Sequence, residues 1–386
     1  MSRGRIPVVH VITRLELGGA QQNTLHTVAQ LDRERFEPWL IAGEGGLLDD
    51  EARALPDVTV HLLPELVRPV SPLKDMAATR SVQALLAPLA AAGPLLVHTH
   101  SSKAGVIGRS AAARLGIHPV VHTIHGFGFA ALGGAFKQRV GLFLERRMAR
   151  HTDAFVSVAE SHLDEGSALG VLGDAVQCVI RSGIDLSDFA RADELRAATR
   201  AELGYSDDTP VIGMVACLKP QKAPLDFVEL AAQVHARHPE ARFFIAGDGE
   251  LRGAVEQRVR ERGLDDVLRL LGWRRDVPAL MGALDIAVLT SLWEGLPRVC
   301  PQAMAAGRPM VATAVDGTPE AVEHGRTGLL FEPGEWSVGA DQVTELIEDP
   351  SLRSRYGEAA RESVWPFDQG LMVRQLEELY GLLLEA

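Results

Sequence analysis

The sequence is poor in cysteine, in aromatic residues and in long apolar runs. Its three cysteines, Cys178, Cys217 and Cys300, are far apart and form no C-x-x-C pair. This excludes a disulfide framework and a cysteine zinc site, and it predicts reduced thiols in a cytosolic protein. No signal peptide is predicted at the N-terminus, and the apolar stretch at 84–97 contains two prolines and is too short for a bilayer span. We therefore expect a cytoplasmic protein whose membrane contact, where it has one, is peripheral.

A basic stripe is also missing. The net charge is −12, with 18 basic and 19 acidic residues in 1–190 against 21 and 32 in 191–386. This balance predicts no nucleic-acid partner. The 386 residues exceed one ordinary hydrophobic core, so two domains are expected, in a monomer or a homodimer.

Short apolar runs alternate with helix-length segments along the whole chain. They lie at 7–12, 38–43, 94–100, 119–125, 154–159 and 175–180, and the pattern restarts at 210–216, 241–247, 267–272, 285–290, 309–313 and 327–331. Continuous apolar runs of this kind predict parallel sheets buried on both faces. We predict an α/β fold of two doubly wound, Rossmann-like domains facing a cleft. The first spans 1–185, the second 186–365, and a terminal helix at 366–386 packs back on the first domain.

Two glycine turns follow predicted strands, but neither is a dinucleotide fingerprint. Gly18 and Gly19 open a helix after the first strand, and Gly247 stands in "GDGELR" after a later one. Glycines at such turns let backbone amides approach a phosphate, although a plain turn explains them equally well. The G-x-G-x-x-G pattern is absent, which disfavours a nicotinamide enzyme.

Cations and histidines follow several other strands. Lys219 and Lys222 lie in the loop after the run at 210–216, where they could neutralise a diphosphate or simply be solvated. His125 ends one run of the first domain, in "VHTIHGFGF". His100 ends another and is followed by Lys103. A histidine at such an edge can contact a sugar hydroxyl, although a structural role is the commoner one.

The segment "SLWEGLPRVCPQAMAAG" at 291–307 carries the densest set of polar groups. Pro297 suits the first turn of a helix running to about Ala306. Arg298 and Gln302 would then share one helical face, with Glu294 just before the helix. A carboxylate, a helix N-terminus and an amide can bind a nucleotide sugar, whereas a capped helix with an exposed polar face is the alternative.

The chain resembles the retaining nucleotide-sugar glycosyltransferases of the GT-B type, family 4. The resemblance rests on motifs that occur in the family's order: "GGA", "HTIHG", "SGIDLSDF", "GDGELR", "SLWEGLPRV…QAMAAGRPMVAT" and "VDGTPEAVEHGRTGLLF". It implies transfer of a sugar with retention, without a metal held by an Asp-x-Asp motif and without a cofactor. The donor would be a nucleotide-diphosphate sugar, most simply a UDP-sugar, with a GDP-sugar as the alternative.

The resemblance also implies roles at matching positions. Glu294 and His125 would act on the donor sugar, and Lys222 would bind the diphosphate. Backbone amides would contribute around Gly19 and from Leu296 to Val299. His100 and Lys103 would face the acceptor. That acceptor would be a glycan or a lipid-linked molecule in surface polysaccharide or glycolipid biosynthesis.

Three positions depart from the family pattern. Gln302 replaces a second glutamate that binds the ribose hydroxyls in the family. The change from a carboxylate to an amide would weaken ribose binding by about 1 kcal/mol. Cys217 replaces an arginine of the diphosphate site, a loss that Lys219 could offset. Pro297 lacks the N–H that a glycine would supply there, and Arg298 could restore a donor.

The segment 136–150 predicts a basic amphipathic helix in the acceptor domain. One side of this helix would carry Phe136, Val140, Phe143 and Leu144, and the other sides would carry most of the cations, Lys137, Arg139, Arg146, Arg147 and Arg150. Docking on an anionic membrane is one interpretation, and a half-buried helix is the other.

Two alternative functions remain open at this point. A non-hydrolysing nucleotide-sugar epimerase would share the architecture but not the "EGLPR" and "HTIHG" motifs. A catalytically silent, nucleotide-sugar-binding partner subunit is the other alternative, which Cys217 and Gln302 leave open.

Overall fold

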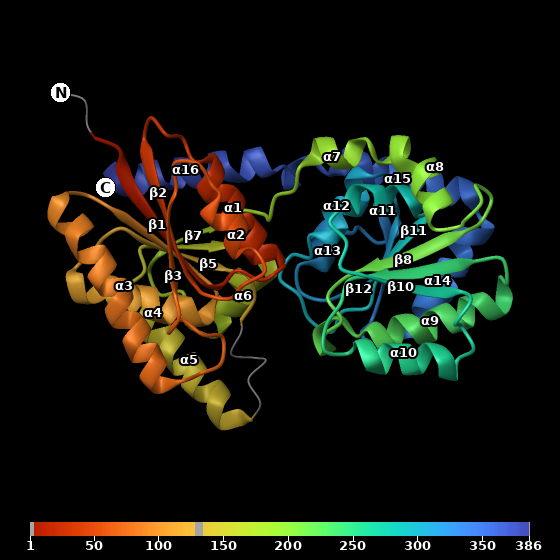
Figure 1. Cartoon of the computed structure of the whole chain (residues 1–386), viewed down its shortest axis with the longest axis horizontal. Coiled ribbons are helices and arrows are strands. Elements are labelled where there is room, and N and C mark those ends of the chain that lie inside the picture. The colour runs from red at the N-terminus through yellow and green to blue at the C-terminus, as the bar shows by residue number, and fades with distance from the viewer. Residues whose placement is uncertain (1–3, 128–133, 386) are drawn as a thin grey trace. The chain divides into compact units, whose positions relative to one another are not determined.

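The computed structural model describes residues 4–127 and 134–385, so Gly128 and Phe129 of the "HTIHGFGF" motif lie outside the described residues. The chain divides into two compact units. Unit 1 comprises residues 1–183 and 369–386, and unit 2 comprises residues 184–368 (Figure 1).

Unit 1 is a seven-stranded parallel sheet of order β3-β2-β1-β4-β5-β6-β7. Its strands are β1 (Ile6–Arg14), β2 (Phe36–Gly43), β3 (Thr59–Leu63), β4 (Leu96–His100), β5 (Val120–Ile124), β6 (Ala154–Ser157) and β7 (Val176–Val179). Its helices are α1 (Gly19–Gln30), α2 (Asp49–Arg53), α3 (Pro72–Ala92), α4 (Ser102–Leu115), α5 (Ala135–Ala149), α6 (Glu160–Ala168) and the C-terminal α16 (Gln369–Glu385).

Unit 2 is a six-stranded parallel sheet of order β10-β9-β8-β11-β12-β13. Its strands are β8 (Val211–Val215), β9 (Arg242–Ala246), β10 (Leu268–Gly272), β11 (Ile286–Leu289), β12 (Met310–Thr313) and β13 (Gly328–Phe331). The helices before β11 are α7 (Leu186–Ala190), α8 (Ala192–Glu202), η1 (Pro220–Lys222), α9 (Pro224–Arg237), α10 (Arg252–Glu261) and α11 (Val277–Ala283). Those after it are α12 (Val299–Ala305), α13 (Thr318–Ala321), α14 (Trp336–Glu348), α15 (Pro350–Ser363) and η2 (Trp365–Phe367).

Each apolar run of the sequence lies on a strand because both faces of each sheet are covered. In unit 1, Val9 and Val97 pack in the core beneath α3 and α4, whereas Val8 and Leu96 pack with Met372 of α16 on the other face. The sequence prediction omitted β3. That strand is half-buried along its whole length, so it lacks the continuous apolar run that marks the others.

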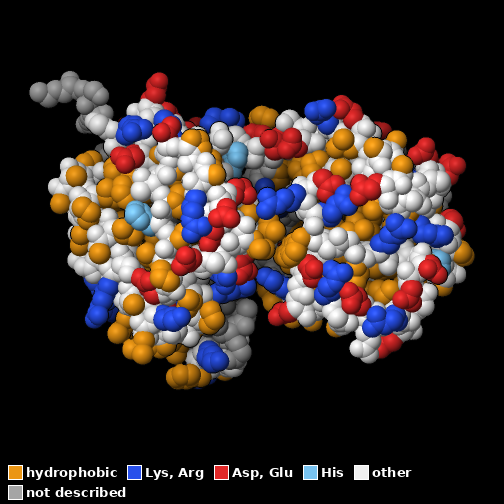
Figure 2. All heavy atoms as spheres, in the orientation of Figure 1, with side chains coloured by type: hydrophobic (Ala, Val, Ile, Leu, Met, Phe, Trp, Pro, Cys, Tyr) orange, Lys and Arg blue, Asp and Glu red, His pale blue; other side chains and the backbone are white. Residues whose placement is uncertain are grey.

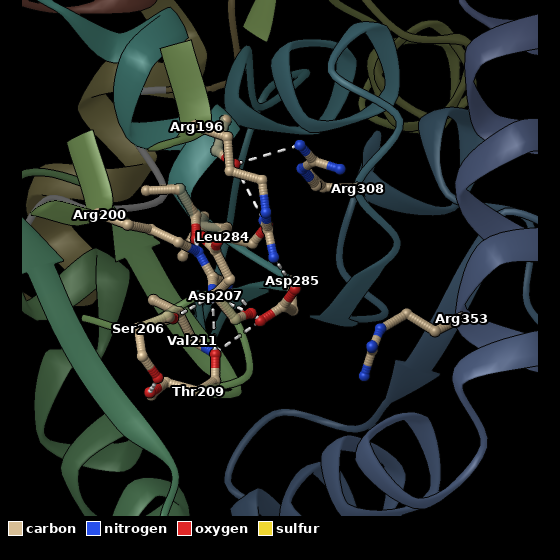
Figure 3. Close-up of polar contacts among 12 residues, drawn as sticks. Arg196, Arg200, Ser206, Asp207, Thr209, Val211, Leu284, Asp285, Arg308 and Arg353 are labelled. Carbon is tan, nitrogen blue, oxygen red and sulfur yellow. Dashed lines mark hydrogen bonds and ion pairs between the residues drawn. The ribbon is translucent and has the colours of Figure 1, made fainter. Parts of the chain in front are cut away.

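An arginine–aspartate network joins the amino-terminal ends of two strands of unit 2 to helix α8 (Figure 3). The Asp285 carboxylate, just before β11, accepts from Arg196 and Arg200 of α8, each at 2.7 Å, and from the backbone N–H of Val211 at 2.8 Å. Arg200 is fully buried and donates also to the carbonyl of Thr209. Burial raises the pKa of Asp285, but the two guanidinium groups outweigh it and lower that pKa overall. The network therefore ties α8 to two neighbouring strands through paired charges.

No helix among the described residues is long and apolar enough to cross a bilayer.

Candidate active site

Glu294 is a buried carboxylate in the loop between β11 and α12. It is 6% exposed. Lys222 donates to its Oε1, and the Ser291 hydroxyl donates to the same oxygen at 2.5 Å. The Glu294 backbone N–H donates to the Asp316 carboxylate at 2.5 Å. A lysine and a hydroxyl therefore hold one carboxylate oxygen, while the loop itself is tied to the segment after β12.

Lys222 reaches Glu294 because β8 and β11 are neighbours in the sheet. The lysine ends η1, which follows β8, and the Thr290 hydroxyl beyond β11 donates to the carbonyls of Lys222 and Ala223, both at 3.0 Å. The Leu292 N–H donates to the carbonyl of Gln221 at 2.7 Å. The two loops are thus joined by hydrogen bonds from one side-chain hydroxyl and one backbone N–H, and the charged side chains of Lys222 and Glu294 meet between the loops.

Three residues of this site were missed by sequence reasoning: Thr290, Ser291 and Asp316. The first two end the apolar run of β11, and the third stands in the "VDGTPE" motif with a φ of +44°. Their position directly after strands was the available signal, since the carboxyl ends of parallel strands meet at one edge.

The segment after Glu294 differs from its predicted form at one end. The helix begins at Val299, with Arg298 as its N-cap, rather than at Pro297. The prediction overweighted proline's preference for a first helical turn. Burial lowers the pKa of Arg298 to about 10, so the guanidinium is still charged at neutral pH. Gln302 follows one turn later, and its N–H donates to the Arg298 carbonyl at 3.1 Å.

Leu296 and Val299, whose amides the sequence assigned to the donor, have buried side chains. Lys219 precedes η1 and is half-buried. Contact of these groups with a donor stays a prediction.

Packing accounts for Gly247. Its φ is +141°, and a Cβ there would lie 2.0 Å from the carbonyl oxygen of Ala216. Gly249 is similar, with a Cβ position 2.5 Å from the carbonyl oxygen of Leu218. The loop after β9 thus packs directly on the loop after β8, and ligand contact by Gly247 stays a prediction.

In unit 1, the glycine turn opens α1. Gly18 is the N-cap in an extended conformation, and Gly19 is the first helical residue. The first turn of α1 holds no acidic side chain. An anion bound at the N-terminus of α1 would therefore not be repelled by a carboxylate of that first turn.

His125 and His100 lie together in unit 1. The ring nitrogens His100 Nδ1 and His125 Nε2 are 3.3 Å apart, and both residues line one small pocket with Thr24 and Ser182. Burial, together with a smaller contribution from nearby His162, lowers the pKa of His125 to about 4. His125 is therefore a neutral imidazole at physiological pH.

Lys103 is held within unit 1 by another element. Its ammonium donates to the Pro69 carbonyl at 2.5 Å and pairs with Asp75 of α3 at 2.6 Å. An acceptor contact of Lys103 would have to compete with this carboxylate, so that assignment stays a prediction.

Comparisons with known proteins cover both units. Residues 18–183 match the model of the glycosyl transferase 4-like domain, and residues 196–363 match that of glycosyl transferases group 1. The chain is 31% identical, over 98% of its length and 97% of the relative's, to UDP-Gal:alpha-D-GlcNAc-diphosphoundecaprenol alpha-1,3-galactosyltransferase of Escherichia coli.

Two solved structures show the same fold. The Anabaena protein HepE in complex with UDP-glucose matches with a TM-score of 0.81 at 22% identity, covering 98% of this chain and 100% of that one. WaaG, a glycosyltransferase involved in lipopolysaccharide biosynthesis, matches with a TM-score of 0.79 at 15% identity, covering 97% and 99%. The predicted α/β fold of GT-B type is confirmed. The chain belongs to the group 1 glycosyltransferase family.

Proposed function

We propose that this protein transfers a sugar, with retention of configuration, from a UDP-sugar to a lipid-linked glycan acceptor. The observation that carries the proposal is the ion pair of half-buried Lys222 with buried Glu294, in the loops that follow two neighbouring strands. The relatives support it, because one is named for UDP-galactose and a diphosphoundecaprenol acceptor and HepE was solved with UDP-glucose. A GDP-sugar is the alternative donor.

The chemistry of the pair fits donor binding. A buried carboxylate accepts hydrogen bonds from sugar hydroxyls, and a lysine ammonium neutralises a diphosphate. Lys222 donates to Glu294, so a bound diphosphate would share the lysine ammonium with this carboxylate. We propose that protein cations and backbone amides, rather than a metal, stabilise the leaving diphosphate.

We propose further that unit 2 supplies the donor contacts and that unit 1 contributes His125 at the donor sugar and the acceptor contacts. The assignment rests on the family motifs in the two units and on the two family models that match them.

Helix α5 supports our proposal of a peripheral membrane contact, which we assign to the cytoplasmic side. Phe136, Val140 and Phe143 follow one another at helical spacing and are 80%, 42% and 63% exposed. The only carboxylate of the helix, Glu145, is buried and paired with Arg109 at 2.6 Å. Figure 2 shows hydrophobic and basic side chains together at the lower end of unit 1, where Figure 1 draws α5. An exposed apolar stripe beside several basic side chains suits an anionic bilayer that holds a lipid-linked acceptor.

A transfer assay tests the main proposal. With UDP-galactose and GlcNAc-diphosphoundecaprenol, we expect turnover by the wild type and a fall in kcat of about 100-fold or more in Glu294→Gln and in Lys222→Met. Surface variants Glu323→Gln and Lys74→Met are the matched controls and should keep wild-type rates. Retained turnover in both loop variants would refute the assignment, and a β-linked product would refute retention.

A panel of UDP-, GDP- and ADP-sugars in thermal shift identifies the donor, because a ligand that binds only the folded state raises Tm. Stabilisation by UDP-sugars alone is expected. Stabilisation by GDP-sugars alone would show that the donor is a GDP-sugar rather than a UDP-sugar.

The silent-subunit alternative rests on Cys217 and Gln302. Restoring both residues in Cys217→Arg/Gln302→Glu discriminates it. If the wild type has almost no transferase activity and the double variant gains much, the protein is a degenerate, silent subunit. If the double variant changes the activity only slightly, the wild type is an enzyme adapted to Cys217 and Gln302.

Vesicle flotation tests the membrane contact. Binding to phosphatidylglycerol vesicles should fall when Arg146, Arg147 and Arg150 are replaced by glutamine, because each cation near an anionic surface contributes about 1 kcal/mol. Unchanged binding, or none in the wild type, would remove the proposal.

A further inference from the structure

A row of histidines crosses the sheet of unit 1 on one face. His10 of β1 is the register partner of His98 of β4, and His100 stands two residues further along β4. Thr123 of β5 is the partner of His100, and His125 follows two residues later. Because side chains alternate along a strand, all of these lie on the face that packs against α16. The row continues the apolar core toward the carboxyl edge of the sheet.

Three of these rings form a hydrogen-bonded chain. His10 Nδ1 lies 2.9 Å from His100 Nε2, and His100 Nδ1 lies 3.3 Å from His125 Nε2. His98 lies outside the chain, because its nitrogens pair with the Tyr380 hydroxyl at 2.5 Å and with Thr123 at 2.7 Å. Each link joins one nitrogen that donates to one that accepts, so the whole chain has a single direction.

The buried end of the chain sets that direction. Among the described residues, His10 Nε2 is buried and has no hydrogen-bond partner. Among backbone groups, a buried N–H without an acceptor is rarer than a buried carbonyl without a donor, and we apply the same preference to the imidazole nitrogens. We therefore assign Nε2 of His10 as the unprotonated nitrogen, so that the Nδ1–H of His10 donates to Nε2 of His100. His100 then donates from Nδ1 to Nε2 of His125.

We propose that His100 is a positioning residue that holds His125 in the neutral tautomer protonated at Nδ1. A neutral imidazole carries one N–H, so a His125 ring that accepts at Nε2 must donate at Nδ1. Under the proposed function, on which this role rests, His125 offers the donor sugar a hydrogen bond without a charge.

The chain stays neutral at physiological pH. Burial lowers the pKa of His10 to about 3, and burial with repulsion from the neighbouring rings lowers that of His100 well below its usual value. The titratable groups near the chain are His98 of β4, His122 of β5 on the opposite sheet face, His162 of α6 and Tyr380 of α16. Burial raises the pKa of the Tyr380 phenol, so it too is neutral.

Nitrogen NMR of ¹⁵N-histidine-labelled protein tests the tautomer without any enzymatic assay. In the wild type, Nε2 of His125 should give a pyridine-like shift and Nδ1 a pyrrole-like one. His100→Leu should release the ring to the Nε2–H form that free imidazole favours. His100→Asn should restore the wild-type tautomer, because its amide N–H can replace Nδ1–H. His98→Leu is the matched control outside the chain.

Activity provides a second reading. His100→Leu should lower kcat about tenfold, as expected for a lost or misdirected donor, and His100→Asn should recover most of it. A wild-type His125 protonated at Nε2 overturns the proposal, as does an unchanged tautomer in folded His100→Leu.

Metal analysis of the purified protein tests the competing explanation, a bound metal ion. Ring nitrogens of His10, His98 and His100 lie within 4.8 Å of one another, so stoichiometric zinc in the purified protein would also overturn the proposal. If the tautomer behaves as described but no sugar is transferred, the proposed function fails and the positioning role stands.

Discussion

Acid should destabilise unit 1 through His10, by an amount that the structure allows us to work out. The ring is fully buried, and burial lowers its pKa from 6.5 to about 3. Below pH 6.5 the unfolded chain takes up a proton at this histidine that the folded chain refuses. The stability is therefore complete above pH 6.5 and is lost as the pH falls from 6.5 toward 3. Linkage gives a loss of about 2 kcal/mol at pH 5 for this one residue.

The comparison of His10→Leu with the wild type isolates that contribution. Amide exchange of β1 peptides, corrected for the intrinsic rate, gives the free energy of opening of unit 1 at about pH 7.5 and pH 5. The wild type should lose about 2 kcal/mol more between the two pH values than His10→Leu. Phe36→Leu, a fully buried change in the same core, should lower both values and keep the wild-type difference. An equal pH-dependent loss in His10→Leu and in the wild type would refute the reasoning.

Three further variants test packing and charge. Asp285→Asn should lower the stability of unit 2 by about 3 kcal/mol in urea unfolding, because it leaves the buried Arg200 without its anion; a loss below 1 kcal/mol would contradict a paired-charge role. Gly247→Ala should lower the Tm by several degrees, since its methyl group would meet the Ala216 carbonyl, and an unchanged Tm would contradict that contact. Phe143→Ser should leave the unfolding free energy within about 0.5 kcal/mol while weakening vesicle binding, and a folding defect would show that α5 is packed rather than exposed.

The local sequence pattern was sufficient to predict most strands of the fold and two charged residues of the candidate site. Runs such as 210–216 and 285–290 became strands because a parallel strand covered on both faces must be continuously apolar. Glu294 and Lys222 were identified because they follow two such runs. The start of α12 was placed too early, since proline's preference for a first turn is only a statistical one.

The sequence by itself determined the two-sheet fold class, the family and the candidate donor loop, because each depends on the order of short local motifs. Only the tertiary structure decided which side chains meet. His10 and His100 are 90 residues apart and touch because β1 lies beside β4, and Asp316 reaches Glu294 across 22 residues. Strand order and register are non-local properties, so the histidine chain and the full setting of Glu294 appear only once the sheets are assembled.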